Sequence, residues 1–141
     1  MPSLAPQSPA LRFRIRNDLS EVSRVNDAVT GHLERRGAGE RLVYATQLAI
    51  EEVLSNVIRH AFGDGSRHEI ALSLRVGEAG VEMEVVDDGR AFDPTAAPEP
   101  ERSAALATRK PGGFGIHLVR AFSREIRYQR LGGLNKLWLR I

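Results

Sequence analysis

A long apolar segment, from about residue 40 to residue 62, limits most strongly how this chain can fold. Its aliphatic residues are too numerous for a single stripe, so a helix formed here must be largely buried. Glu52, Asn56 and His60 nevertheless recur at intervals of four and share one face of that helix. Because burying polar groups is costly unless they are paired, water, an ion, a ligand or other side chains must lie opposite them.

The helix alone leaves two interpretations of this polar stripe open. Asparagine offers a neutral oxygen ligand suited to magnesium, and a carboxylate one turn away can orient and deprotonate a hydroxyl or a water molecule. An ordinary structural network along a solvated stripe would use the same residues. Other parts of the chain must therefore decide between them.

The remaining segments predict an α+β fold. Alternation of apolar and polar residues predicts strands at 11–16, 69–76, 81–86, 125–130 and 134–141, the first of them at or near a sheet edge. Helical spacing predicts helices from Asp18 to about Gly37, from about 40 to 62, and from Gly113 to about 123, and Asp18 with Glu21 resembles a capping box. We expect a two-layer α/β sandwich, with three helices on a mixed, mainly antiparallel sheet of about five strands.

Length and composition limit the class of protein. We expect residues 1–10 to be a disordered tail and residues 11–141 to form a single domain. No run approaches the ~20 apolar residues of a membrane span, and the start lacks the features of a secretory signal, so we expect a cytoplasmic protein without membrane contact. The absence of cysteine excludes disulfides and thiolate zinc sites, and a net charge of +2 does not favour direct nucleic-acid binding.

Two further segments suit nucleotide binding. The strand at 81–86 runs into Asp87-Asp88-Gly89, where a carboxylate can accept a hydrogen bond from the adenine amine and glycine allows close approach. Residues 111–115 form a glycine-rich loop that opens a helix, and free amides at a helix N-terminus favour phosphate. Taken singly, the first segment is most often a turn and the second a hinge. The stretch between them, about 91–111, is long for a connection and suggests a lid.

The order and spacing of these features resemble the GHKL, or Bergerat-fold, ATPases over essentially the whole of residues 11–141. Glu52-x-x-x-Asn56-x-x-x-His60-Ala61-Phe62 resembles the N box, Asp87-x-Gly89 the first glycine box, and Gly113-x-Gly115 the second. Within the superfamily, Asp-Asp-Gly-Arg-x-Phe-Asp-Pro and Gly-x-Gly-Ile-His-Leu-Val are similar to the anti-sigma-factor serine/threonine kinases of bacterial partner-switching systems.

The resemblance implies a Bergerat ATP-binding fold that uses Mg-ATP, with Glu52 as catalytic base and Asn56 holding Mg2+. It implies that Asp87 reads adenine and that Gly113 and Gly115 cradle phosphates. Further contacts to the nucleotide are expected from Arg59, His60, Gly89, Ala91, Phe92, Arg109, Lys110, Gly112, Phe114 and Ile116. Two positions depart from the superfamily pattern: Ala91 stands where a second glycine is frequent, and Asn135 where other branches have threonine.

The resemblance also implies a function: phosphorylation of a small anti-anti-sigma (antagonist) protein, and sequestration of a sigma factor by a homodimer. The alternative is a catalytically silent ATP-binding module that controls a partner by binding only, and the retained Glu52 favours chemistry. A sensor histidine kinase is disfavoured because the sequence leaves no room for a dimerisation helix with its own histidine. A structural protein without a ligand would not explain three nucleotide-like boxes in this order.

Overall fold

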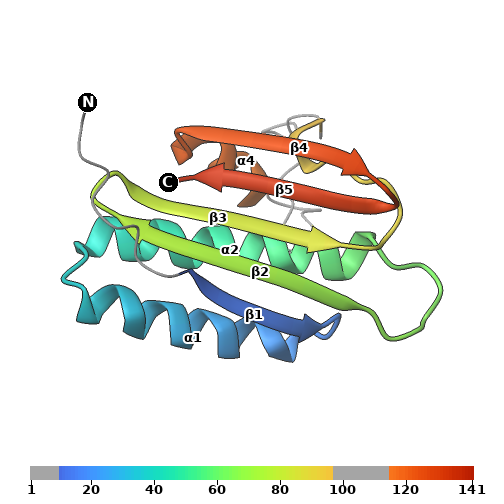
Figure 1. Ribbon diagram of the computed structural model, residues 1–141, viewed down its shortest axis with the longest axis horizontal. Helices are drawn as coiled ribbons and strands as arrows, with labels where there is room; N and C mark the ends of the chain where they lie inside the picture. Colours follow the sequence, from blue (N-terminus) through green and yellow to red (C-terminus); the bar gives the residue numbers. More distant parts are fainter. Residues whose placement is uncertain (1–9, 97–114) are drawn as a thin grey trace, which may run out of the picture.

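The computed structural model describes residues 10–96 and 115–141, in which three α-helices lie on a five-stranded sheet (Figure 1). The strands are β1 (Leu11–Arg16), β2 (Glu69–Gly77), β3 (Gly80–Asp87), β4 (Glu125–Leu131) and β5 (Leu134–Arg140). The helices are α1 (Ser20–Arg35), α2 (Glu40–His60) and α4 (Gly115–Phe122), with a short 3-10 helix, η1 (Pro94–Ala96). The predicted α+β class is confirmed. The predicted tail before residue 10 and the predicted lid beyond residue 96 lie outside the described residues.

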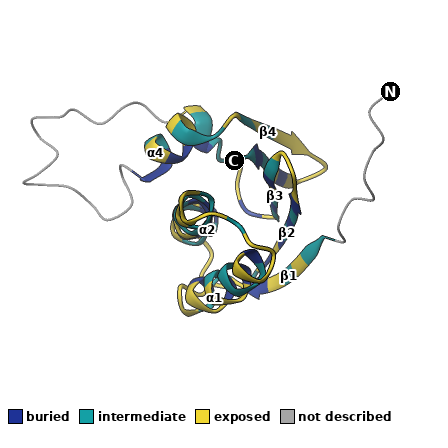
Figure 2. Cartoon of the chain, turned by 90° about the vertical axis from the view of Figure 1, so that its left-hand side faces the viewer, coloured by how far each residue is buried: buried dark blue, intermediate teal, exposed yellow. Residues whose placement is uncertain are grey.

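The sheet has the order β1-β2-β3-β5-β4, and each neighbouring pair is antiparallel. β1 therefore lies at a sheet edge, as its sequence predicts. Figure 2 shows all three helices on the same face of the curved sheet, where buried residues gather. The core combines inward-facing aliphatic residues of the strands with the apolar faces of α1 and α2, and its fully buried members include Ile15, Val25, Leu33, Ile50, Leu54, Ile70, Leu72, Leu74, Met83 and Leu139.

The start of α1 differs from the predicted capping box. The Asp18 carboxylate accepts hydrogen bonds from the backbone N–H and the hydroxyl of Ser20, both at 3.0 Å. Glu21 pairs with Arg24, and at 3.8 Å with Arg16 of β1. Because these nearby cations engage Glu21, the helix starts without the reciprocal bond of a capping box and Glu21 links it to β1.

Two junctions position the predicted site: one between α2 and the end of β3, and one between α2 and α4. α2 and β3 end on the same side of the molecule (Figure 1), which brings the first glycine box next to the end of the polar stripe. α4 begins at Gly115 and packs against α2 further back along the same helix. Among the described helices, none is long and apolar enough to cross a membrane.

Candidate functional site

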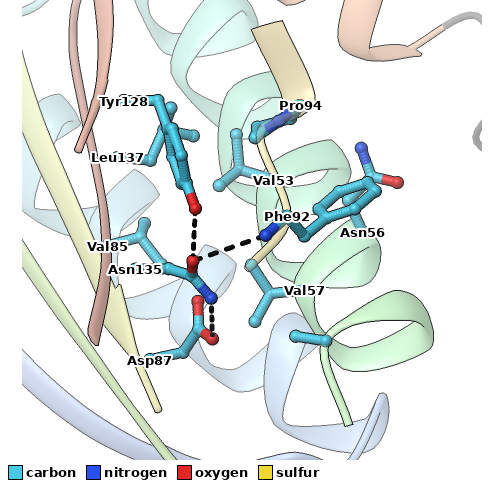
Figure 3. Close-up of a pocket in the computed structure, with 11 residues that line it drawn as sticks. Val53, Asn56, Val57, Val85, Asp87, Phe92, Pro94, Tyr128, Asn135 and Leu137 are labelled. Carbon is cyan, nitrogen blue, oxygen red and sulfur yellow. Dashed lines mark hydrogen bonds between the residues drawn. The ribbon is translucent and has the colours of Figure 1, made fainter. Parts of the chain in front are cut away.

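A small, mainly apolar pocket with a cavity volume of about 10 Å³ lies between α2 and the strands β3, β5 and β4 (Figure 3). A cavity of this size has room for about one water molecule, while its apolar walls with a few convergent polar groups are typical of small-molecule sites. The lining residues are Val53, Asn56, Val57, Ala61, Val85, Asp87, Phe92, Pro94, Tyr128, Asn135 and Leu137. The pocket therefore brings together the N box and the first glycine box.

Asp87, the last residue of β3, provides the carboxylate of this pocket and is only 4% exposed. Its Oδ1 accepts hydrogen bonds from the Gly89 backbone N–H and from Asn135 Nδ2, both at 2.9 Å. Within the described part of the chain, Oδ2 accepts no hydrogen bond. The protein thus engages one oxygen of the carboxylate with two donors, while the described residues give the other oxygen no hydrogen bond.

The first glycine box docks directly on the C-terminal end of α2. A Cβ atom at Gly89 would lie 2.5 Å from the carbonyl oxygen of Ala61, so only glycine fits this close approach. Arg90 donates its backbone N–H to the same oxygen at 2.9 Å and its Nε to the carbonyl oxygen of His60 at 2.7 Å. These bonds satisfy carbonyl groups that the helix end leaves unpaired.

The polar stripe of α2 extends from this junction toward α4. Asn56 lines the pocket, and the exposed His60 stacks on Phe92 with ring centroids 5.6 Å apart. Glu52 is partly buried, and a Cβ atom at Gly115 would lie 1.7 Å from its Cδ and 1.9 Å from its Oε2. Gly115 of the second glycine box therefore meets the stripe at the Glu52 carboxylate.

Residues 15–141 match the histidine kinase-like ATPase domain family. The chain belongs to this family. The serine/threonine-protein kinase BtrW of Bordetella bronchiseptica is 38% identical over 99 residues, which cover 70% of each chain. The serine-protein kinase RsbW of Oceanobacillus iheyensis is 24% identical over 112 residues, 75% of this chain and 70% of its own, and RsbW of Bacillus subtilis is 24% identical over 110 residues, 75% and 69%. The resemblance to GHKL kinases found in the sequence is confirmed.

Several residues that the family resemblance assigned to the nucleotide lie elsewhere. Arg59 lines a hollow between α1 and α2, with Glu51 and Ser55, because it precedes His60 of the polar stripe by one residue and this offset turns it by about 100° toward α1. Ile116 is buried in the core and Ala91 is exposed at the surface. The structure does not bring these three into the pocket. Outside the described residues lie Arg109, Lys110, Gly112, Gly113 and Phe114.

Of the pocket residues that the sequence did not predict for the site of this histidine kinase-like ATPase domain, two are polar: Asn135 and Tyr128. Asn135 is 4% exposed and donates to Asp87, although the sequence marked it only as a departure from the family pattern. A signal for it existed: residues 135, 137 and 139 face inward on β5, and Asn135 is the polar one among two leucines. Tyr128 faces inward on β4 and donates its hydroxyl to Asn135 Oδ1.

Proposed function

We propose that this protein is an ATP-dependent serine/threonine protein kinase that phosphorylates a small anti-anti-sigma (antagonist) protein and also sequesters a sigma factor. The observation that most directly supports kinase chemistry is the arrangement of Glu52. This carboxylate lies one turn from Asn56 on the pocket side of α2 and against the first residue of α4. The family match and the protein-kinase names of the relatives support the same function.

In this proposal the small apolar pocket widens to admit the adenine ring, whose amine donates to Oδ2 of Asp87. Val53, Val57 and Leu137 provide apolar walls for the ring, and burial of its faces stabilises the complex. The phosphates extend along α2 toward the start of α4, where free amide groups and the helix dipole favour negative charge.

The side chains present fit a magnesium ion that arrives with the nucleotide. Among the described residues, no group of three or more histidine, cysteine, aspartate or glutamate residues could hold a metal. Magnesium commonly takes one or two protein oxygen ligands and completes its shell with phosphate and water. The Asn56 amide oxygen would hold it, and the bound ion would neutralise charge on the phosphate oxygens.

The proposed transfer step assigns the proton to Glu52. The serine or threonine Oγ of the antagonist attacks the γ-phosphorus, and the bond from this phosphorus to the β–γ bridging oxygen breaks. Glu52 takes the proton of the attacking hydroxyl, and the products are ADP and the phosphorylated antagonist. A carboxylate suits activation of a hydroxyl, which agrees with serine as the acceptor named for the relatives.

The proposal further includes sigma-factor binding, a homodimer, a lid formed by about residues 91–111, a single domain at 11–141 and a cytoplasmic location. They are supported by the resemblance to the anti-sigma branch. The competing proposal is an ATP-binding module that regulates a partner without phosphorylating it. Transfer of label from ATP distinguishes the two.

The test combines calorimetry with Mg-ATP and transfer of labelled phosphate to a candidate antagonist protein. We expect Asn56→Ala and Asp87→Asn each to weaken ATP binding by about tenfold or more, because each removes a polar partner of the nucleotide. Glu52→Ala should retain binding and lose transfer. Glu51→Ala, on the α1 side of the helix, is the matched control and should change neither.

Two results would contradict the proposal in different ways. Unchanged ATP affinity in both the Asn56 and the Asp87 variants would refute the site assignment. ATP binding by the wild-type protein without label on any antagonist would favour the silent module.

A further inference from the structure

Asn135 lies beside Asp87 at the buried side of the pocket. The register of β3 and β5 pairs Asp87 with Asn135, so both side chains project from the same face of the sheet (Figure 3). Nδ2 of Asn135 donates to Asp87 Oδ1 at 2.9 Å and to the carbonyl oxygen of Arg90 at 2.8 Å. Both amide hydrogens of Asn135 therefore have acceptors within ordinary hydrogen-bond distance.

The opposite end of the Asn135 amide is held equally firmly. Oδ1 accepts hydrogen bonds from the Tyr128 hydroxyl, from Arg130 Nη1 at 3.1 Å and from the Phe92 backbone N–H at 3.4 Å. Turning the amide around would place its N–H groups against these donors and its oxygen against the Asp87 carboxylate. The surroundings consequently fix the donor end of Asn135 toward Asp87.

This orientation determines which part of Asp87 faces a ligand. Two N–H groups, from Gly89 and Asn135, hold Oδ1, and rotation of the carboxylate would break both bonds. Oδ2, which accepts no hydrogen bond within residues 10–96 and 115–141, is left as the acceptor of the pocket. An ionised carboxylate oxygen only accepts, so it pairs with an N–H group and repels a carbonyl oxygen.

We infer that Asn135 determines the nucleobase selectivity of this site. By fixing Asp87, it makes Oδ2 a directed acceptor for the 6-amino group of a purine and excludes 6-keto purines, whose oxygen would face Oδ2. The inference rests on the proposed function, in which the pocket binds a purine nucleoside triphosphate. Asn135 acts through Asp87 and is thus a positioning residue, assisted by Tyr128.

The test compares dissociation constants for ATP and inosine triphosphate (ITP), which differ at the 6-position and the proton on the adjacent ring nitrogen. With ITP bound, Asp87 Oδ2 would face the 6-keto oxygen, and two buried acceptors that face each other are unfavourable. We therefore expect the wild-type protein to prefer ATP by about 100-fold. Asn135→Ala should reduce this ratio to below about tenfold, because Oδ1 then keeps only its bond to the Gly89 N–H and the Asp87 carboxylate can turn away from the 6-position of the base. A purely structural role of Asn135 would weaken the binding of ATP and ITP alike and would leave the ratio of their dissociation constants unchanged.

Two companion variants keep the test decisive. Tyr128→Phe removes one donor to Asn135 Oδ1 without emptying the pocket, and should reduce the ratio to an intermediate value. Lys136→Ala changes the next residue on β5, which is exposed on the opposite face of the sheet, and should leave the ratio unchanged.

The possible failures separate this inference from the proposed function. If the Asn135 and Tyr128 variants both keep the wild-type ratio, the inference is overturned while the ATP site stands. If Asn135→Ala does not fold, the ratio for Tyr128→Phe decides alone. If the wild-type protein binds neither ATP nor ITP, the proposed function fails as well.

Discussion

Replacing Gly115 with alanine would test whether the Glu52 side chain is what requires glycine at the start of α4. The added Cβ would lie 1.7 Å from Cδ and 2.2 Å from Cγ of Glu52, so the glutamate or the helix must move. Overpacking of this kind typically costs about 1–3 kcal/mol. With an unfolding entropy of roughly 2.1 cal/mol/K per residue, the melting temperature should fall by roughly 3–10 °C.

The same substitution should be harmless when the Glu52 side chain is shortened. In a Glu52→Ala background the overlapping atoms are absent, and alanine exceeds glycine in helix propensity by about 0.5–1 kcal/mol. The double variant Glu52→Ala/Gly115→Ala should therefore melt at or slightly above the temperature of Glu52→Ala. The double-mutant cycle should give a coupling energy of about 1–3 kcal/mol.

The assay is thermal denaturation by circular dichroism, with ATP affinity and phosphate transfer measured on the same samples. Gly115→Ala should reduce transfer more than ATP affinity, because it displaces the proposed base. Glu51→Ala/Gly115→Ala is the matched control, and this carboxylate on the other side of α2 should give no rescue. Equal melting of Gly115→Ala and wild type, or rescue by the control, would refute the packing argument.

Three further predictions concern stability and the pocket. Gly89→Ala should lower the melting temperature and weaken ATP binding by about tenfold, as measured by calorimetry, because the Cβ separates β3 from the end of α2. The hydrogen bond between His68 and Asp64 raises the pKa of His68 above 6.5 and lowers the pKa of Asp64 to about 2. The contribution of this ion pair to stability is therefore fully present from about pH 4 to 6.5. It is lost as the pH falls toward 2 and as the pH rises through the raised pKa of His68. His68→Gln should flatten this pH dependence of the melting temperature. Ile50→Ala, at a fully buried position, should cost roughly 2–5 kcal/mol in urea unfolding.

The fold could be predicted from the sequence because local patterns and burial agree. Alternation over 69–76 and 81–86 predicted the hairpin of β2 and β3, and the apolar segment from residue 40 predicted α2. The start of α1 could not be predicted as well, because several polar side chains near Asp18 compete for the same groups. The pairing of Glu21 depends on β1, which brings Arg16 close to it.

The candidate site was predictable where a motif fixes the local geometry and less so where distant strands meet. Asn56 and Asp87 lie in one pocket, as the boxes predict. Arg59 lies toward α1 because one residue of helical offset changes the face by about 100°. Asn135 joins Asp87 only through the pairing of β3 with β5, a register that no short motif encodes.

The contacts of Gly89 and Gly115 connect the two glycine boxes of this chain to one helix, α2. Gly89 packs on Ala61, the C-terminal cap of α2, and Gly115 packs on Glu52, so these two glycines contact the same helix at positions nine residues apart. At 1.5 Å per residue this separation is about 14 Å along the helix axis. In the proposed function, the Gly89 junction holds the base and the Gly115 junction receives the phosphates. The polar stripe of Glu52, Asn56 and His60 then follows the nucleotide from its phosphates to its base, which gives these polar side chains a partner opposite the apolar face of α2.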